Sequence, residues 1–302
     1  MTKVFIDGSA GTTGLKIRER LGKRSDLSLI EVPQEERKDP AARQRAMQEA
    51  EIVFLCLPDD AAREAAKLAG DRVVIDTSTA HRCEPGWVYG FPELAGQREK
   101  IRSSLRIANP GCHASGFIAL MAPLVERGLV PRDLPVSATS LTGYTGGGRK
   151  MIESYAENGA GLRGMRTYAL SQSHKHLPEM MRYTGLEHRP VFLPIVGAYP
   201  QGMEVLVPLP LDLEPEAVLS VYRAVYRDGM VRTGDMDEAG FLSSDALAGT
   251  DEMRLMAWGR PGQLVLSARF DNLGKGACGA AIQNMNLVLG LAEDTGLERS
   301  QG

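Results

Sequence analysis

The chain has few cysteines and no long apolar run, and each shortage excludes a class of protein. Its four cysteines, Cys56, Cys83, Cys112 and Cys278, are far apart and form no C-x-x-C pair, which argues against a disulfide scaffold and a structural zinc site. No segment offers the ~20 apolar residues that a membrane helix needs. The first residues form a strand-like run rather than a signal peptide. We therefore expect a cytoplasmic protein with no membrane partner.

The sequence also lacks an excess of either charge. Its 35 basic and 38 acidic residues give a net charge of −3, whereas a nucleic-acid-binding domain is expected to be basic. The five histidines include no helical zinc motif, so we predict no metal. With 302 residues, of which 43% are hydrophobic, the chain is long enough for about two domains with well-covered cores.

Short β-rich runs alternate with helical stretches over the first ~110 residues, a pattern typical of a parallel sheet with crossover helices. The expected strands are near-continuous apolar runs, as in a sheet buried on both faces. The predicted strands are 4–6, 27–32, 52–57 and 72–76, and the predicted helices are 12–22, 41–49 and 60–68.

The pattern changes after Cys112, where strand-like runs are separated by long polar or glycine-rich loops. This change predicts an inserted α+β domain with a mostly antiparallel sheet, including strands at 136–141, 191–196, 203–208 and 263–270. The helical spacing over 276–292 predicts a last helix that packs on the first domain. The predicted class is α/β, with a Rossmann-type domain formed by 1–111 with 275–302 and a catalytic and oligomerisation domain formed by 112–274.

A glycine-rich loop follows the first strand and opens the first helix. Such a loop provides a tight turn and lets backbone amides approach a pyrophosphate, so it predicts dinucleotide binding. Glycine-rich turns also occur without a ligand, but the surrounding βαβ pattern favours a nucleotide. The predicted cofactor-binding residues are Gly8, Ser9, Ala10, Gly11, Thr12, Thr13 and Gly14.

The choice of nicotinamide cofactor remains open at this level. Glu31, near the end of the second strand, is placed to bind a ribose 2′-hydroxyl and favours NAD. Arg37 and Lys38 are placed to bind a 2′-phosphate and favour NADP. All three are equally compatible with solvated loop charges.

Asn109-Pro110-Gly111-Cys112 ends an apolar run in a sharp turn and places a thiol at the expected start of a helix. A helix N-terminus stabilises a thiolate, which is the nucleophilic form of cysteine. A buried structural cysteine is the alternative. Following a nucleotide-binding domain, a reactive thiol indicates acyl-thioester chemistry with hydride transfer.

That chemistry needs a proton donor and acceptor near the sulfur, and histidine suits the task. His176 is the best candidate, with Glu179 three residues later to orient or charge-stabilise its ring. A surface loop is the alternative.

The glycine cluster of 142–150, which includes Arg149, suits an anionic group or a flexible linker. Arg82 follows a strand end and would contact the substrate phosphate, the cofactor or a surface carboxylate.

These motifs together resemble the N-acetyl-gamma-glutamyl-phosphate reductases, in the form of their shorter subgroup, and the resemblance covers nearly the whole chain. It rests on the cysteine turn with Gly116 and Pro123 downstream and on further motifs along the sequence. These are the glycine loop 8–14, Asp76 to Arg82, Tyr89 to Leu94, His174 to Glu179, Asp271 to Ala277 and Gln283 to Asn286.

The resemblance implies the two-domain fold of aspartate-semialdehyde dehydrogenase, NADP(H) as cofactor, and a cytoplasmic homodimer or homotetramer. It implies Cys112 as the nucleophile, His176 as the acid/base and Glu179 as its support, with a weaker role for Tyr168 in binding substrate. His113 and Ser115 depart from the family pattern, where an aromatic residue and a threonine are usual. The role of His113 stays open.

The expected reaction is attack of the Cys112 thiolate on N-acetylglutamyl phosphate, release of phosphate, and reduction of the thioester by NADPH to the semialdehyde, in arginine biosynthesis. Backbone amide at Cys112 and the side chain of Asn109 would hold the oxyanion, a contribution of ~3 kcal/mol per donor. Aspartyl phosphate or a carrier-bound aminoadipyl phosphate is an alternative substrate. A non-catalytic nucleotide sensor, with an unreactive Cys112, is the alternative from another class.

Overall fold

The computed structural model describes residues 1–159, 161–236 and 240–300, which form two compact units. Unit 1 comprises Met1–Pro92, Gly96–Pro110 and Ala277–Leu297. Unit 2 comprises Glu93–Ala95, Gly111–Gly276 and the described residues after Leu297. Residues 301 and 302, which the predicted division gave to the first domain, lie outside the described residues.

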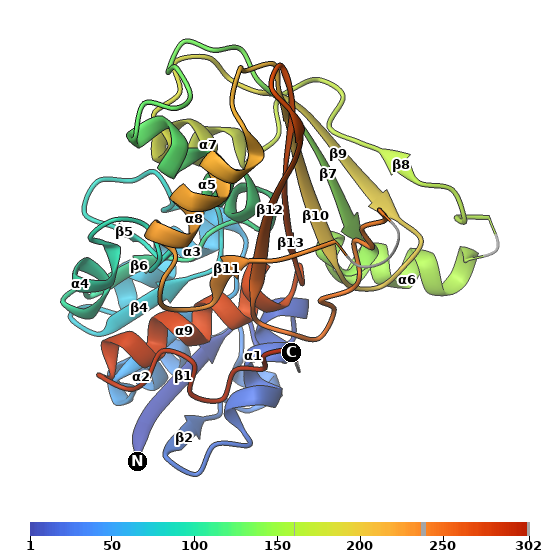
Figure 1. The fold of residues 1–302 in the computed structure, drawn as a ribbon. Helices are drawn as coiled ribbons and strands as arrows, with labels where there is room; N and C mark the ends of the chain where they lie inside the picture. Colours follow the sequence, from blue (N-terminus) through green and yellow to red (C-terminus); the bar gives the residue numbers. More distant parts are fainter. Residues whose placement is uncertain (160, 237–239, 301–302) are drawn as a thin grey trace. The chain divides into compact units, whose positions relative to one another are not determined.

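Unit 1 is built on a six-stranded sheet with the order β2-β1-β3-β4-β6-β5 (Figure 1). Every pairing in it is parallel, and the central register aligns Phe5 with Ile30 on one side and Val53 on the other. The predicted parallel sheet is therefore confirmed. Its strands are β1 (Thr2–Asp7), β2 (Leu27–Ile30), β3 (Ile52–Leu55), β4 (Val73–Asp76), β5 (Val88–Tyr89) and β6 (Arg106–Ala108).

Helices cover this sheet because successive strand residues present apolar side chains to opposite faces. Val4 and Ile6 belong to a core that includes residues of α1 and α9, whereas Phe5 belongs to a core with residues of α2 and α3. The predicted return of the last helix to the first domain is confirmed. The helices are α1 (Thr12–Leu21), α2 (Pro40–Glu49), α3 (Asp59–Leu68), α4 (Gln97–Arg102) and α9 (Gly279–Val288).

Unit 2 contains a mixed seven-stranded sheet with the order β11-β12-β13-β10-β7-β9-β8. Four of its pairings are antiparallel and two are parallel, so the predicted mostly antiparallel sheet is confirmed. The strands are β7 (Ser137–Gly143), β8 (Arg166–Thr167), β9 (Val191–Gly197), β10 (Met203–Leu209), β11 (Val231–Thr233), β12 (Met253–Arg260) and β13 (Gln263–Phe270).

One face of this sheet is covered by α5 (Cys112–Glu126), which also contacts α7 (Leu177–Thr184) and α8 (Pro215–Val225). The helix approaches the sheet so closely that a Cβ at Gly116 would lie 2.6 Å from Cγ2 of Val205. Only glycine fits at that position, one turn after Cys112. Tight packing of α5 thus fixes where its first residue lies.

The glycine cluster is ordered rather than a linker. β7 ends at Gly143, a 3₁₀ turn spans Tyr144–Gly147, and α6 (Gly148–Asn158) follows at once.

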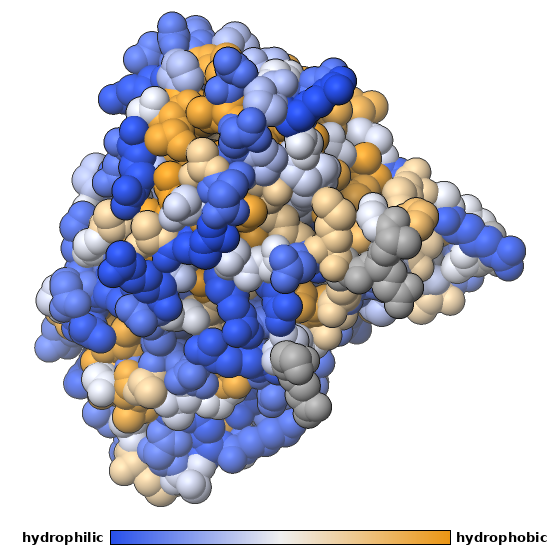
Figure 2. All heavy atoms as spheres, in the orientation of Figure 1, coloured by the Kyte–Doolittle hydropathy of each residue, from blue (hydrophilic) through white to orange (hydrophobic). Residues whose placement is uncertain are grey.

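Figure 2 shows, on the side viewed, hydrophilic side chains over much of the surface with smaller groups of apolar side chains between them. Within the described ranges, no helix combines the length and apolar character that crossing a bilayer requires.

Candidate active site

The cysteine turn joins β6 to α5, with Gly111 in extended conformation as the residue before the helix and Cys112 as its first residue. The predicted helix start is therefore confirmed. The first amides of a helix have no acceptor within it, and the first turn of α5 contains no acidic residue. Both features favour the thiolate form of a half-buried thiol at this position.

The loop that follows β13 in unit 2 lies against Cys112. A Cβ at Gly276, after β13, would lie 3.0 Å from Cβ of Cys112 and 3.0 Å from the carbonyl oxygen of Asp271. The loop that follows β13 therefore passes directly beside the thiol. Burial raises the pKa of the Cys56 thiol in unit 1 to about 12, so Cys56 is not a competing nucleophile.

The start of α7 anchors the cysteine turn. His176 is the residue before this helix, and Pro178 lies in its first turn. Glu179 is 1% exposed, and its Oε2 accepts a hydrogen bond of 3.1 Å from the backbone nitrogen of Gly111. The carboxylate thus fixes the residue that precedes Cys112, a contact across 68 positions that the sequence does not reveal.

An imidazole and aromatic cluster lies beside this turn. The ring centroids of His113 and His176 are 5.6 Å apart, those of His174 and His176 are 4.7 Å apart, and Phe192 of β9 contacts both His113 and His174 edge to face. His176 is 5% exposed. Both histidines of the predicted His174-Lys175-His176 segment therefore lie within the cluster that includes His113, rather than on a surface loop.

His113 is hydrogen bonded through both ring nitrogens. Its Nδ1 lies 2.7 Å from Oγ of Ser140 on β7, and its Nε2 lies 2.7 Å from the hydroxyl oxygen of Tyr168. Burial, and secondarily the charges of His174 and Lys175, lower the pKa of His113 from 6.5 to about 3. Burial, and secondarily the charge of Cys112, raise the pKa of Tyr168 above its usual range.

The remaining predicted substrate residues lie in different settings. In unit 1, Nε of Arg82 donates a 2.9 Å hydrogen bond to the carbonyl oxygen of Asn109, which supports the turn before the cysteine. The Asn109 side chain donates to the carbonyl of Ala277 and accepts from Asn284. Arg149 is exposed on α6 and pairs with Glu153 at 2.7 Å.

The glycine loop of unit 1 satisfies separate steric demands at its three glycines. Gly8 has φ +88°, and a Cβ there would lie 2.3 Å from the carbonyl oxygen of Cys56. At Gly14, a Cβ would lie 2.4 Å from the oxygen of Gly8, so close packing of α1 on the loop needs a glycine. At Gly11 the nearest protein atom would be 3.5 Å away, which is ordinary contact. The glycine at 11 is therefore not needed for packing and leaves room for a ligand to approach the backbone.

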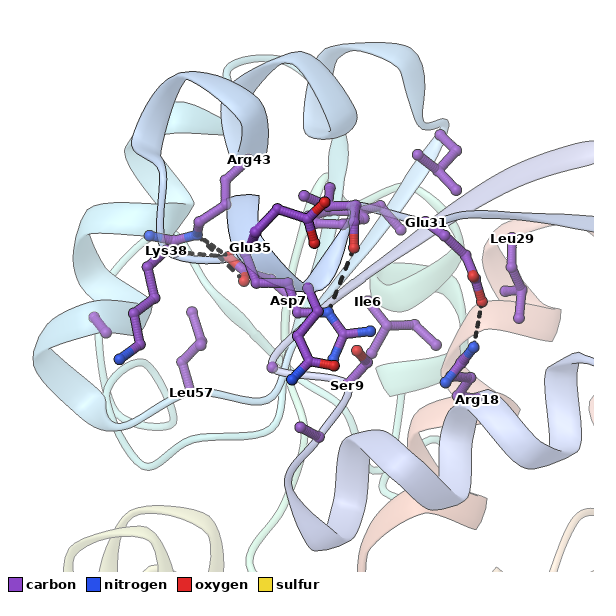
Figure 3. A pocket seen from close by; sticks show the side chains of 18 residues that line it. Ile6, Asp7, Ser9, Arg18, Leu29, Glu31, Glu35, Lys38, Arg43 and Leu57 are labelled. Carbon is purple, nitrogen blue, oxygen red and sulfur yellow. Dashed lines mark hydrogen bonds and ion pairs between the residues drawn. The ribbon is translucent and has the colours of Figure 1, made fainter.

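A pocket of about 600 Å³ opens beside this loop, within unit 1 (Figure 3). Two ion pairs cross its wall: Arg43 of α2 binds buried Asp7 at 2.7 Å, and Arg18 of α1 binds Glu31 at 2.5 Å. Other lining residues include Ser9, Ala10, Arg37 and Lys38. The volume, the amide-rich loop and the surplus of cations fit a nucleotide with phosphate groups.

Two family models match successive parts of the chain. The family model described as "Semialdehyde dehydrogenase, NAD binding domain" matches residues 3–104, and "Semialdehyde dehydrogenase, dimerisation domain" matches residues 112–272. The structure of aspartate semialdehyde dehydrogenase II from Vibrio cholerae, complexed with ASA, has a TM-score of 0.72 at 15% identity and covers 96% of this chain and 98% of its own. The enzyme from Candida albicans, solved with NADP, has a TM-score of 0.64 at 14% identity, covering 96% and 98%.

The two family models, with a fold shared by the solved structures, define the chain as a semialdehyde dehydrogenase. Among full-length relatives, "N-acetyl-gamma-glutamyl-phosphate reductase 2" of Pseudomonas putida is 46% identical over 97% of this chain and 98% of its own. The N-acetyl-gamma-glutamyl-phosphate reductase of Burkholderia ambifaria is 44% identical over 96% of each chain. The chain belongs to the N-acetyl-gamma-glutamyl-phosphate reductase family.

Proposed function

We propose that this chain catalyses the NADPH-dependent reduction of N-acetyl-L-glutamyl 5-phosphate to N-acetyl-L-glutamate 5-semialdehyde and phosphate, in arginine biosynthesis. The observation that carries the proposal is Cys112 as the first residue of α5, on a turn held by Glu179, in a chain with 44–46% identity to reductases named for this substrate. The aspartate semialdehyde dehydrogenases are only 14–15% identical to this chain, so their structural similarity supports the fold and not the substrate.

In this proposal the Cys112 thiolate attacks the acyl carbon, the carbon–oxygen bond to phosphate breaks, and phosphate leaves with the electron pair. The product of the step is an acyl thioester on Sγ. The N-terminal amides of α5 stabilise the negative charge on the acyl oxygen, a contribution of ~3 kcal/mol per donor. Asn109 is a further proposed donor.

His176 exchanges the proton. It gives a proton to the oxygen of the reduced acyl group and takes it back as the carbon–sulfur bond breaks, so that Cys112 leaves as thiolate. Its buried position beside the cysteine turn supports this role. Glu179 supports His176 and fixes Gly111.

The loop from Gly8 to Gly14 would hold the pyrophosphate of NADP(H), and the cations of the pocket would hold the remaining phosphate. When bound, the cofactor supplies the hydride that reduces the acyl group. Tyr168 contacts the acyl group, and Arg149 and Arg82 are the proposed cations for the substrate phosphate.

A homodimer, or a homotetramer built from such dimers, is the proposed assembly. On the face of the unit 2 sheet opposite α5, Val191 and Leu193 of β9 are 55% and 38% exposed, whereas Phe192 between them in the chain is buried. Leu206, Val265 and Trp258 lie on the same face and are half-buried. A second copy of the chain would cover this face, as the dimerisation-domain match supports. Sedimentation of wild type and Leu193→Asp tests it.

We propose 1–111 with 275–302 as the cofactor domain and 112–274 as the catalytic and oligomerisation domain. We also propose the cytoplasm as the site of action, because the reaction uses NADPH and a labile acyl phosphate; cell fractionation tests this.

The function is tested by phosphate-dependent reduction of NADP with three semialdehydes: those of N-acetylglutamate, aspartate and carrier-bound aminoadipate. We expect kcat/KM for N-acetylglutamate semialdehyde to exceed the values for the other two semialdehydes by about a hundredfold or more. A site that forms hydrogen bonds with the acetamido group leaves its own buried polar groups unsatisfied when a substrate lacks that group. A preference for either other compound would overturn the substrate assignment.

A further inference from the structure

The segment that carries Tyr168 is held in a costly backbone conformation. Ala169 and Gln172 have φ of +51° and +55°, in the left-handed region that residues other than glycine rarely adopt. Such conformations persist only where contacts with the surrounding structure hold them in place, and they are enriched at functional sites. Within the described ranges, Ala169 and Gln172 are the only residues other than glycine with a positive φ, and both belong to this segment.

Three contacts fix this segment to β9. The backbone nitrogen of Tyr168 donates to the carbonyl oxygen of Pro194 at 3.1 Å. The side chain of Gln172 binds Phe192 twice: Nε2 donates to its carbonyl oxygen at 2.9 Å, and Oε1 accepts from its nitrogen at 2.8 Å. The segment is therefore held to β9 at the Tyr168 nitrogen and, through the Gln172 side chain, four residues later. The phenol ring needs a further contact to fix its direction.

His113 supplies that contact, with Ser140 behind it. In the part of the chain that the structure describes, the hydroxyl of fully buried Ser140 has one hydrogen-bond partner, Nδ1 of His113. A buried hydroxyl places its hydrogen on an acceptor, so Ser140 donates to Nδ1. A neutral imidazole then carries its hydrogen on Nε2 and donates it to the Tyr168 oxygen. The phenol hydrogen stays available for another acceptor.

The pKa values of Tyr168 and His113 are both shifted in the direction that keeps these two rings neutral. Burial, and secondarily the charge of Cys112, raise the pKa of Tyr168, so the phenol stays protonated. Its hydroxyl lies 2.7 Å from the ring of His113, the residue that follows Cys112 in the chain. Burial and the neighbouring His174 and Lys175 hold the pKa of His113 at about 3, so the ring stays neutral at neutral pH. His113 is therefore not a second titrating group in the site.

We propose that His113 is a positioning residue: backed by Ser140, it orients the Tyr168 hydroxyl so that its hydrogen points at Cys112 and then at the acyl group bound there. The second half of this statement rests on the proposed function of Cys112. The residue after the cysteine thus acts through Tyr168 and exchanges no proton with substrate.

The test compares His113→Phe, Tyr168→Phe and the double variant, with His113→Gln as the conservative replacement. Tyr168→Phe removes one oxygen and should leave the fold intact. We expect each single variant to lower kcat about tenfold to a hundredfold with little change in KM, because one oriented donor is lost. The double variant should be no slower than the slower single variant, and His113→Gln should recover part of the rate. His188→Gln, on an exposed histidine, is the matched control and should be unaffected.

The pH profile separates positioning from acid/base catalysis. His113→Phe should keep every limb of the wild-type kcat profile between about pH 5 and 9. Loss of a limb would make His113 an acid/base and overturn the proposal. Additive losses in the double variant, or an unchanged rate in His113→Phe, would overturn it as well.

A substrate-independent readout keeps this inference distinct from the proposed function. Alkylation of Cys112 by iodoacetamide, located by peptide mass spectrometry, gives the apparent pKa of the thiol. Both His113→Phe and Tyr168→Phe should raise it by about half a unit to one unit, because the thiolate loses a hydrogen-bond donor. Failure of His113→Phe to shift it, when Tyr168→Phe does, would overturn the positioning role. A shift without any wild-type turnover would instead refute only the function.

Discussion

The backbone nitrogen of Gly111 donates a hydrogen bond of 3.1 Å to the buried carboxylate of Glu179. The contact ties the first turn of α7 to the residue before Cys112. It therefore joins the start of α5, where the proposed nucleophile lies, to the start of α7, which directly follows the proposed acid/base His176. The sequence predicts Glu179 only as support for His176. The structure adds that the same carboxylate holds the cysteine turn.

Replacement of Glu179 separates these two tasks. Glu179→Ala leaves a buried amide without its acceptor and should lower the free energy of unfolding by about 1–3 kcal/mol. Glu179→Gln keeps an acceptor oxygen, so most of that stability should remain while kcat falls because the charge is lost. Urea unfolding and steady-state kinetics measure the two effects. Equal destabilisation by Ala and Gln would show that Gly111 does not depend on this acceptor.

Cys112→Ser should abolish turnover while leaving NADPH binding unchanged, because serine at neutral pH is not ionised and the pocket lies in unit 1. Activity is measured with the semialdehyde and phosphate, and binding by the fluorescence of NADPH. Cys83→Ser is the matched control and should retain activity. Turnover by the Cys112→Ser enzyme would refute the thioester mechanism and favour a non-catalytic role for this thiol.

His176→Asn should lower kcat by about a hundredfold or more, since general acid–base catalysis contributes at that scale. KM should change much less, because the proton is exchanged on the acyl group rather than used to hold the substrate. Pre-steady-state phosphate release locates the slow step. A rate equal to that of wild type would leave His176 with a structural place in the imidazole cluster only.

Selectivity between NADP and NAD should follow the charges around the pocket. Glu31 pairs with Arg18, which offsets a carboxylate that otherwise repels a 2′-phosphate, although both side chains are exposed and the pair is screened. We expect 2′,5′-ADP to bind about tenfold or more tightly than 5′-AMP, measured by calorimetry. The difference should shrink in Arg37→Gln and Lys38→Gln and persist in Lys67→Gln. Equal affinities for the two nucleotides in wild type would favour NAD.

Stability should depend on pH through His113. The unfolded ring takes up a proton below about pH 6.5, whereas the pKa in the folded chain is about 3, so the unfolded state binds more protons as the pH falls. The neutral His113 ring therefore contributes its full share to the free energy of unfolding above pH 6.5, and this share is lost as the pH falls toward 3. The loss amounts to ~2–3 kcal/mol between about pH 7.5 and 4.5. Urea unfolding of wild type and His113→Gln at both values measures it. The variant should lose that much less stability on acidification, and identical losses would contradict the neutral buried ring.

Local sequence patterns were sufficient for most of unit 1. Strand 52–57 and helix 41–49 are found as β3 and α2 with small changes at their ends, because apolar runs and helical spacing act over a few neighbouring residues. The strand β12 was missed, although Pro261-Gly262 between it and β13 is a turn signal that would have indicated a hairpin. The helices α4, α6 and α8 were also not predicted.

The sequence by itself determined the parallel sheet, the glycine loop that opens α1, and the placement of Cys112 at a helix start, because each depends on residues adjacent in the chain. Only the tertiary structure decided what surrounds that thiol. His113 meets Ser140 and Tyr168 across 27 and 55 positions, and Gly111 meets Glu179 across 68. Such contacts arise from the packing of α5 and α7 with the second sheet, and no short-range pattern of residue types specifies them.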